Sequence, residues 1–411
     1  MRLSSVVVVG AGLAGAMAVT ALRDQGFEGE VTLLGAEGLE PYDRPPLSKE
    51  LLTRTSPAWL RDELGADLSR ARARLADPAT ALEVDDDGVT VTTATGTVRA
   101  DAAVLATGAE AVRPPGWDAA LTMHTAADAD ALRAAVRPGA RLVVVGAGWI
   151  GAEVAGVAAG AGAHVTVVEA AAAPLETALG PTGALTAPWY DAAGVRLLVG
   201  TRVDAVRADG VQLDDGRTLE ADAVLVAVGA RPRTAWLGDA LPVAPDGALV
   251  VDERYRVLRG DRALPHVVAV GDAARRRSAR HGWVPGGHWD GALRGPAVAV
   301  RTLLAGPDVD AAGPPDDPAP YVFSTQLGHE LALYGHPLPT DDVVVRHGDD
   351  GLTALWFRPG SEDLAAVLAV DRPRDVAAAR KLFTGRALPR LDRTAAADGT
   401  RPLKTLLRAT T

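Results

Sequence analysis

Short runs of aliphatic residues alternate with longer stretches in which apolar positions recur at helical spacing. Residues 6–9 are four valines, residues 14–23 have a helical pattern, and residues 29–37 form a second apolar run. A run that is apolar on both faces and rich in β-branched residues is typical of a buried parallel strand. This order therefore predicts a strand–helix–strand unit at the start of the chain.

The same order occurs again later in the chain. Residues 142–145 are predicted to form the strand, residues 150–161 the helix and residues 163–170 the next strand. Apolar strands are also predicted within 100–116 and 220–234, and each leads through a glycine into a proline-containing crossover. The pattern predicts an α/β fold with two units of the nucleotide-binding type.

A G-x-G-x-x-G motif joins strand to helix in both units. The glycines are Gly10, Gly12 and Gly15 in the first copy, and Gly146, Gly148 and Gly151 in the second. In this motif the first glycine allows a tight turn, the second allows a pyrophosphate to approach and the third allows helix and strand to pack closely. An acid, Glu37 or Glu169, follows near the end of each second strand. The alternative interpretation is a pair of glycine turns without a ligand.

Composition narrows the chemistry. The 411 residues suffice for two or three domains, and a net charge of −10 argues against generic nucleic-acid binding. Cysteine is absent, which excludes thiolate, disulfide and cysteine-bound metal chemistry within this chain. The histidines form no ligand cluster, so no metal site is predicted. Neither a membrane helix nor a signal peptide is evident, so we expect a cytoplasmic protein.

One motif is more specific than the glycine turns. The stretch PYDRPPLSKELL, residues 41–52, resembles the flavoprotein ferredoxin reductases of bacterial oxygenase and cytochrome P450 systems, the putidaredoxin reductase and biphenyl dioxygenase reductase group. The resemblance continues in order along the chain, through LATGA, VVVGAGWIGAEVA, VAVGARP, AVGDAAR, HWDGAL, FSTQ and RPLKTLL.

This resemblance implies a glutathione-reductase-like architecture, with two Rossmann-like domains, one inserted in the other, and a C-terminal α+β domain. The FAD-binding domain would comprise residues 1–112 and 239–312. The NADH-binding domain would comprise residues 113–238, and the C-terminal domain residues 313–411. A linker is expected after Gly306, where proline and aspartate become frequent.

The resemblance also implies the site residues. FAD would contact Gly10, Gly12, Ala14, Gly15, Arg44, Lys49, Arg133, Asp272 and Trp289. NADH would contact Gly146, Gly148, Ile150, Gly151, Glu169 and Gly229. Further cofactor contacts are expected from Glu37, Ala79, Thr107, Gly108, Glu153, Gly271 and His288. Lys49 and Glu153 would form the catalytic pair beside the flavin.

Residue chemistry supports parts of this assignment. A carboxylate at Glu169 can bond both hydroxyls of an adenosine ribose and repels a 2′-phosphate, which favours NADH over NADPH. Lys49 is one of three lysines in a chain that otherwise uses arginine, and a compact ammonium fits beside a flavin ring better than a guanidinium does. A lysine–glutamate pair would compensate the charge of both groups on burial.

The expected activity is electron transfer from NADH through FAD to a separate iron–sulfur ferredoxin, by a monomer or a homodimer. An NADH oxidase or quinone reductase on the same fold, and a flavin-binding regulatory protein, remain alternatives. The chain departs from the family pattern at Ala36, Gly287, Phe323 and Thr325. The basic run at 273–283 is predicted either to steer an acidic ferredoxin or to be a solvated loop.

Overall fold

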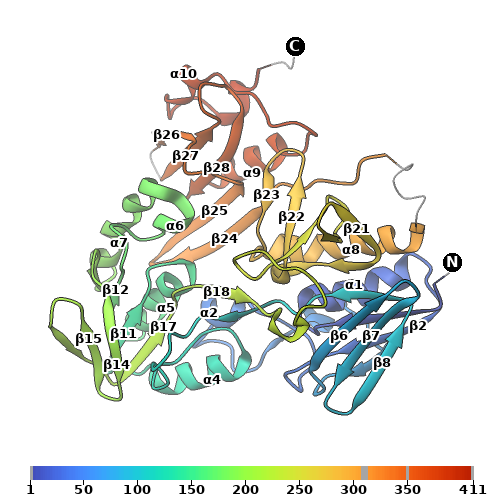
Figure 1. The fold of residues 1–411 in the computed structure, drawn as a ribbon. Coiled ribbons are helices and arrows are strands. Elements are labelled where there is room, and N and C mark those ends of the chain that lie inside the picture. Colours follow the sequence, from blue (N-terminus) through green and yellow to red (C-terminus); the bar gives the residue numbers. More distant parts are fainter. Residues whose placement is uncertain (1–2, 307–312, 349–350, 409–411) are drawn as a thin grey trace. The chain divides into compact units, whose positions relative to one another are not determined.

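The computed structural model describes residues 3–306, 313–348 and 351–408 and divides into two compact units (Figure 1). The first unit consists of Met1–Asp43, Ala58–Glu110 and Arg231–Tyr321. The second unit consists of Arg44–Pro57, Ala111–Ala230 and Val322–Thr411. The two glycine motifs therefore lie in different units, and each unit is described by itself below.

A largely parallel sheet forms the centre of the first unit. Its strands are β1 (Ser5–Val9), β2 (Glu30–Leu34), β5 (Arg72–Arg74), β9 (Ala102–Leu105), β19 (Leu249–Val251), β20 (Arg256–Arg259), β21 (Arg262–Ala269), β22 (Ala274–Ser278) and β23 (Gly282–Val284). They lie in the order β23-β22-β19-β20-β21-β9-β1-β2-β5. β1 pairs in parallel with β2 and with β9, and its valines are at most 2% exposed, as a strand buried on both faces requires.

Helices α1 (Leu13–Asp24) and α8 (Trp289–Ala305) pack together in the first unit (Figure 1). α1 directs Ala14, Ala18 and Leu22 into the same apolar cluster as the valines of β1, so the predicted strand–helix–strand unit is confirmed. Shorter elements complete the unit, namely β3 (Tyr42–Asp43), β4 (Ala58–Trp59) and α3 (Leu60–Glu63).

The second unit repeats this arrangement with a smaller parallel sheet. Its strands are β11 (Arg141–Val145), β12 (His164–Val168), β13 (Arg196–Leu198) and β17 (Ala223–Val226), in the order β13-β12-β11-β17. Its helices are α2 (Pro46–Lys49), α4 (Ala126–Ala135), α5 (Trp149–Gly160), α6 (Glu176–Leu179) and α7 (Ala187–Ala192). α5 follows β11 directly, which confirms the second predicted strand–helix–strand unit.

Each unit also contains a three-stranded antiparallel sheet that the sequence analysis did not predict. In the first unit it is β6 (Ala79–Asp85), β7 (Gly88–Thr93) and β8 (Gly96–Ala100); in the second it is β14 (Val203–Arg207), β15 (Gly210–Leu213) and β16 (Thr218–Glu220). Gly88 and Gly210 begin the middle strands with φ +150° and +151°. The short strands β10 (Ala109–Ala111) and β18 (Ala230–Pro232) contain two of the points where the chain passes from one unit to the other.

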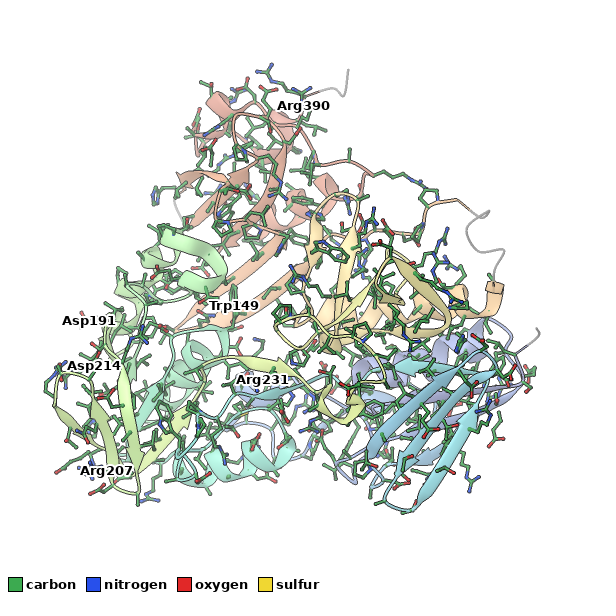
Figure 2. All side chains as sticks on the ribbon, viewed as in Figure 1. Trp149, Asp191, Arg207, Asp214, Arg231 and Arg390 are labelled. Carbon is green, nitrogen blue, oxygen red and sulfur yellow. The ribbon has the colours of Figure 1, made fainter. Side chains whose placement is uncertain are left out.

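The C-terminal part of the second unit is an antiparallel sheet with helices. It contains β24 (Tyr321–Gln326), β25 (His329–Gly335), β26 (Asp342–His347), β27 (Leu352–Phe357), β28 (Leu364–Val370), α9 (Pro373–Leu382) and α10 (Arg393–Ala396), with the strand order β24-β25-β28-β27-β26. The predicted α+β region is thus confirmed. Figure 2 shows Trp149 at the start of α5, where it packs against the apolar cluster of this sheet. Residues 307–312 of the predicted linker lie outside the described residues.

Among the helices that the structure describes, none combines the length and the apolar character needed to cross a lipid bilayer.

Candidate functional site

The first glycine turn connects β1 to α1. Gly10 has φ +110°, and a Cβ added there would lie 2.1 Å from the carbonyl oxygen of Ala106, just after β9. A Cβ added at Gly15 would lie 1.8 Å from the carbonyl oxygen of Gly10. Both positions therefore require glycine, for the tight turn and for the close packing of helix on strand.

Gly12 serves a different purpose, because a Cβ there would have no described atom within 4 Å. Gly12 directly precedes α1, and no side chain of the described residues caps this helix with a hydrogen bond. The first amide groups of a helix lack partners within the helix and attract anions. The open side of Gly12 and the uncapped start of α1 therefore fit the pyrophosphate of a dinucleotide.

The end of β21 reaches the start of α1 in the same unit. A Cβ added at Gly271 would lie 2.9 Å from the Cβ of Ala14. The next residue, Asp272, accepts a hydrogen bond from the Gly287 amide at 2.9 Å. A Cβ at Gly286 would lie 2.6 Å from the Asp272 Cα, so this loop passes directly over Asp272. The structure thus places Gly271 and Asp272 beside the first glycine turn.

His288 and Trp289 follow this loop, and Trp289 is the first residue of α8. His288 Nδ1 lies 3.1 Å from the carbonyl oxygen of Pro285, and burial lowers the pKa of the imidazole below its ordinary value of 6.5. The Trp289 indole N–H donates to the Asp43 carboxylate at 2.7 Å. Both rings are therefore held in place by contacts within the first unit.

The two residues of β3 connect further predicted positions. Asp43 accepts the Trp289 bond, and the neighbouring Tyr42 hydroxyl donates to the Glu37 carboxylate at 2.5 Å. Glu37 is exposed on the loop after β2. β3 therefore links the acid that follows the first glycine turn to the start of α8.

The remaining predicted residues of the first unit are Thr107, Gly108 and Ala79. Thr107 donates its hydroxyl to the carbonyl oxygen of Arg233 at 2.7 Å, and Gly108 has φ +66°. Ala79 is the first residue of β6 and pairs with Thr93. The assignment of Ala79 to the cofactor rests on the resemblance alone.

The second glycine turn, between β11 and α5, repeats the geometry of the first. Gly146 has φ +103°, and a Cβ added there would lie 2.5 Å from the carbonyl oxygen of Ala227. A Cβ at Gly151 would lie 2.0 Å from the carbonyl oxygen of Gly146, whereas Gly148 faces open space among the described atoms. Ile150, at the start of α5, is 39% exposed. This turn fits a second dinucleotide.

Glu169, which follows the end of β12, stabilises the second turn through hydrogen bonds. Its carboxylate accepts the Ala147 amide at 2.7 Å through one oxygen and the Ala171 amide at 2.7 Å through the other. Each carboxylate oxygen has two lone pairs, so Glu169 retains acceptor sites for ribose hydroxyls. Burial raises the pKa of the nearby Tyr190 hydroxyl, and the charge of Glu169 adds to this effect. Gly229, at φ +118°, follows β17 and accepts the Val112 amide at 3.0 Å.

Lys49 and Glu153 form an ion pair in the second unit, although they lie far apart in the sequence. Lys49 ends α2, and Glu153 lies on the buried face of α5 with 5% exposure. Ser48 donates to the same carboxylate at 2.5 Å, and Ser324 of β24 donates to it as well. The structure thus brings the predicted pair together and surrounds its carboxylate with hydroxyl donors.

Two predicted arginines lie in the same unit and bind backbone carbonyls. Arg44 donates to the carbonyl oxygen of His124. Arg133, on α4, donates to the carbonyl oxygens of Leu51 and Arg54, each at 2.8 Å. These bonds fix the segment around α2 that carries Lys49.

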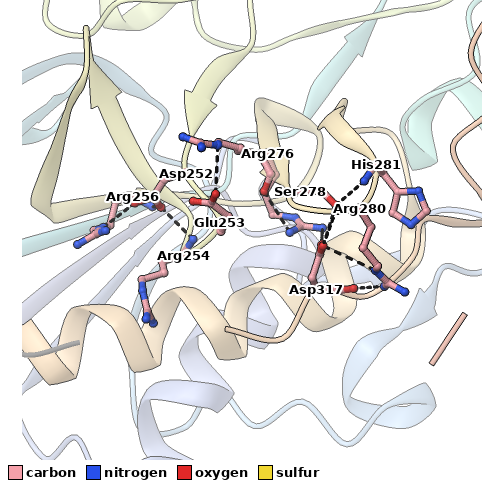
Figure 3. Close-up of polar contacts among 10 residues, drawn as sticks. Asp252, Glu253, Arg254, Arg256, Arg276, Ser278, Arg280, His281 and Asp317 are labelled. Carbon is pink, nitrogen blue, oxygen red and sulfur yellow. Dashed lines mark hydrogen bonds and ion pairs between the residues drawn. The ribbon is translucent and has the colours of Figure 1, made fainter. Parts of the chain in front are cut away.

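The basic run at 273–283 is neither a fully exposed positive patch nor a plain solvated loop, because two of its arginines are buried (Figure 3). Arg276 and Arg280 are 6% and 9% exposed, and both pair with Asp317 of the first unit. Burial acts to raise the pKa of Asp317, but the charge of Arg276 and the Ser278 hydroxyl outweigh this effect and lower the pKa below its ordinary value. Arg277 is exposed and pairs with Glu253 at 3.1 Å. The arginines chiefly hold the segment that carries Asp317.

Sequence reasoning missed several residues that hold the predicted ones. They are Tyr42, Asp43, Ser48, Ser324 and Gln326. The first three lie inside the PYDRPPLSKELL motif and the last two inside FSTQ, so membership of these motifs was the available signal. Among the described residues, no group of three or more His, Asp or Glu side chains could hold a metal ion.

Comparison with known proteins gives consistent matches over nearly the whole chain. Residues 4–288 match the family model described as pyridine nucleotide-disulphide oxidoreductase, and residues 321–407 match the model described as reductase C-terminal. The chain is 34% identical to the anthranilate 1,2-dioxygenase system ferredoxin–NAD(+) reductase component of Burkholderia cepacia, over 98% of each chain.

Two solved structures are similar throughout. The crystal structure of Fdr9 superimposes with a TM-score of 0.88 at 38% identity and covers 97% of this chain and 99% of its own. The covalent complex of putidaredoxin reductase with putidaredoxin gives a TM-score of 0.88 at 27% identity, with 98% of each chain covered.

Proposed function

Because the chain belongs to the pyridine nucleotide-disulphide oxidoreductase family, we propose that it passes electrons from NADH through FAD to a ferredoxin-type iron–sulfur protein. The partner serves an oxygenase or a cytochrome P450. Two facts support this partner: a relative named as a dioxygenase-system ferredoxin reductase is 34% identical over 98% of the chain, and putidaredoxin reductase was crystallised with putidaredoxin. Membership of this family also agrees with the resemblance found in the sequence motifs.

The duplicated glycine turn carries this proposal. Gly12 and Gly148 face open space at the starts of two long helices, while the flanking glycines pack against carbonyl oxygens. FAD is assigned to the first turn and NADH to the second. Asp272 is assigned to FAD because the end of β21 meets the start of α1, next to this turn. When bound, FAD accepts a hydride from NADH and releases the electrons one at a time.

The second turn selects the nucleotide. Glu169 lies at the end of β12, the position from which a carboxylate reaches an adenosine ribose. Its bonds to Ala147 and Ala171 hold it there before any nucleotide arrives. A fixed negative charge at this point favours the free ribose of NADH and repels the 2′-phosphate of NADPH.

Lys49 supplies the positive charge at the flavin, and Glu153 holds it. The pair lies in the second unit with side chains 17% and 5% exposed. A preorganised ammonium stabilises electron density that moves onto the bound ring. Trp289 is assigned to the face of the ring, where Asp43 fixes its orientation.

The finer assignments follow the same division. FAD is bound by residues 1–112 and 239–312, NADH by residues 113–238, and residues 313–411 form the C-terminal domain. The protein acts in the cytoplasm as a monomer or a homodimer. In support of these boundaries, the chain changes from one compact unit to the other between Glu110 and Ala111 and again between Ala230 and Arg231.

Anaerobic stopped-flow mixing with NADH and with NADPH tests the proposal. The purified protein should contain FAD, and NADH should bleach the visible absorbance of the flavin much faster than NADPH does. A small iron–sulfur ferredoxin, added next, should restore the absorbance in proportion to its concentration. Mixing with air alone is the matched control.

Each of the other outcomes indicates a different function for this protein. Fast reoxidation by air without ferredoxin indicates an NADH oxidase, and reoxidation by a quinone indicates a quinone reductase. Bound flavin that NADH does not bleach indicates a regulatory flavin-binding protein. A protein that binds no flavin overturns the proposal altogether.

A further inference from the structure

The Lys49 ammonium lies against two partners of different kinds. One is the Glu153 carboxylate, with which it forms an ion pair. The other is the ring of Phe323 on β24, whose centroid lies 5.3 Å from Nζ. Phe323 is also one of the positions where the sequence departs from the family pattern.

The Glu153 carboxylate is itself held from two elements other than its own. Ser48 donates from α2, Ser324 donates from β24, and Glu153 extends from α5. Gln326 then donates to the Ser324 hydroxyl at 3.0 Å, and both residues are 1% exposed. A carboxylate has about four acceptor sites, so several donors can hold it in one orientation. The anion that attracts Lys49 is therefore fixed in place.

The Phe323 ring restricts the position of the Lys49 ammonium in a way that the Glu153 carboxylate alone does not. An ion pair alone lets a long lysine side chain rotate about its partner, because the attraction depends weakly on direction. The face of an aromatic ring attracts a cation through its quadrupole, and an aliphatic side chain of similar size does not. With Glu153 as one partner and Phe323 as the other, the ammonium has fewer positions open to it.

We propose that Phe323 is a positioning residue for Lys49, and that its ring and the Glu153 carboxylate together hold the ammonium where the flavin needs it. The inference rests on the proposed function, in which Lys49 contacts FAD. Phe323 thus acts through Lys49. A tryptophan at this position would preserve the contact, whereas a leucine would fill a similar space and remove it.

Lysine resonances report the contact directly, because Lys49, Lys381 and Lys404 are the only lysines in the chain. Protein labelled with carbon-13 at the lysine Cε positions should give three signals, and the ring of Phe323 should shift that of Lys49. In Phe323→Leu the Lys49 signal should move toward those of Lys381 and Lys404. Phe323→Trp should keep it displaced. Lys49→Arg assigns the signal, and the other two lysines are controls within each spectrum.

The flavin provides the second measurement, on the FAD-loaded protein. The limiting rate of flavin reduction by NADH should fall about threefold to tenfold in Phe323→Leu, the range for losing one cation–π contact. Phe323→Trp should restore it, and the concentration of NADH at half-maximal rate should stay unchanged. Phe27→Leu is the matched control, because it removes a ring that lies 5.8 Å from Arg23 in the first unit.

Several results overturn the inference. One is a Lys49 signal that does not move in Phe323→Leu, and another is an unchanged reduction rate. A rate that falls equally in Phe323→Leu and Phe323→Trp is a third. Phe323→Met replaces the leucine variant if the latter does not fold. A wild-type protein without FAD contradicts the proposed function instead, and the lysine spectra then still decide whether Phe323 holds Lys49.

Discussion

Gly10 and Gly146 hold nearly the same backbone conformation, with φ +110° and +103°, and each packs against a carbonyl oxygen just after a neighbouring strand. Gly15 and Gly151 also match, because each packs against the carbonyl oxygen of the first glycine in its own turn. The likeness extends to Gly88 and Gly210, which begin the middle strands of the two antiparallel sheets at φ +150° and +151°. The two units therefore have the same backbone conformation at these glycines.

The acids that follow the two turns differ. Glu169 is partly buried and accepts the amides of Ala147 and Ala171, so it is built into its own turn. Glu37 is exposed and accepts the Tyr42 hydroxyl of β3. A shared backbone therefore supports two kinds of nucleotide contact, one fixed within the turn and one held from outside it. The experiments below separate these two arrangements.

The largest effect is expected where the two turns are alike. Gly15→Ala and Gly151→Ala each place a methyl group within 1.8 Å or 2.0 Å of a carbonyl oxygen, so the backbone must move. We expect a cost of about 3 kcal/mol or more at either position. Gly15→Ala should yield protein without FAD, whereas Gly151→Ala should retain FAD that NADH reduces slowly. Flavin absorbance and stopped-flow reduction measure the two outcomes.

The control for this pair is Gly160→Ala, at the end of α5, where a Cβ meets open space among the described atoms. Its flavin content and reduction rate should equal those of the wild type. If Gly151→Ala loses FAD and Gly15→Ala keeps it, the assignment of the cofactors to the two turns is reversed.

The second effect tests the acids. Glu169→Ala removes the carboxylate that is proposed to bond the ribose, and hydrogen bonds to a charged group contribute about 1.5–3 kcal/mol, so kcat/KM for NADH should fall about tenfold to a hundredfold. The amides of Ala147 and Ala171 also lose their acceptor. Glu37→Ala changes an exposed residue, so FAD affinity should change by less than about 1 kcal/mol. Steady-state kinetics and flavin titration measure these values.

Reversing the charge sharpens the same test. Glu169→Arg should lower the preference for NADH over NADPH, because a guanidinium attracts the 2′-phosphate that a carboxylate repels. The ratio of the two kcat/KM values measures this preference. An unchanged ratio would remove Glu169 from the account of nucleotide choice, and equal losses in Glu37→Ala and Glu169→Ala would remove the difference between the two turns.

The repeated turns were predictable because their chemistry is local. A strand, a spaced set of glycines and a helical pattern occupy consecutive positions, so the sequence sufficed for β1, α1, β11 and α5. The pairing of Lys49 with Glu153 came from a family resemblance, because these residues meet only through tertiary packing.

Other features followed from contacts that no local pattern encodes. The arginine run has the composition of an exposed basic patch, yet Arg276 and Arg280 are buried and both pair with Asp317, which lies on a segment distant in the sequence. The hydroxyl donors of Glu153 and the Asp43 acceptor of Trp289 likewise come from separate elements. The exposure of the arginines and the partners of Glu153 and Trp289 thus depend on tertiary contacts, which composition does not reveal.

A third experiment tests how Asp43 holds the indole ring of Trp289 in the first unit. Asp43→Ala removes the acceptor of the Trp289 indole N–H, which should cost about 1 kcal/mol and lower FAD affinity about fivefold. The concentration of NADH at half-maximal reduction rate should not change, because the second turn is intact. Trp283→Phe is the control, since that indole is 41% exposed and lies on β23 of the same unit. A loss of FAD affinity in both variants would show that the loop, and not the Asp43 bond, is responsible.

The smallest effect is a pH dependence confined to the first unit. Burial lowers the pKa of both His288 and His266 below 6.5, so the folded state binds fewer protons than the unfolded state. Their contribution to stability is complete above about pH 6.5 and decreases as the pH falls below it. We expect the free energy of unfolding to decrease between about pH 7 and pH 5.

Flavin release during urea unfolding measures this dependence, because free FAD is more fluorescent than bound FAD. His288→Gln keeps a neutral side chain at every pH and should remove part of the slope between about pH 7 and pH 5. Asp317 affects a lower range, because its pKa is lowered from 3.8 and its contribution is lost only as the pH falls through that lower value. An unfolding midpoint that stays constant down to about pH 5 would show that His288 and His266 have the same pKa in the folded and unfolded states.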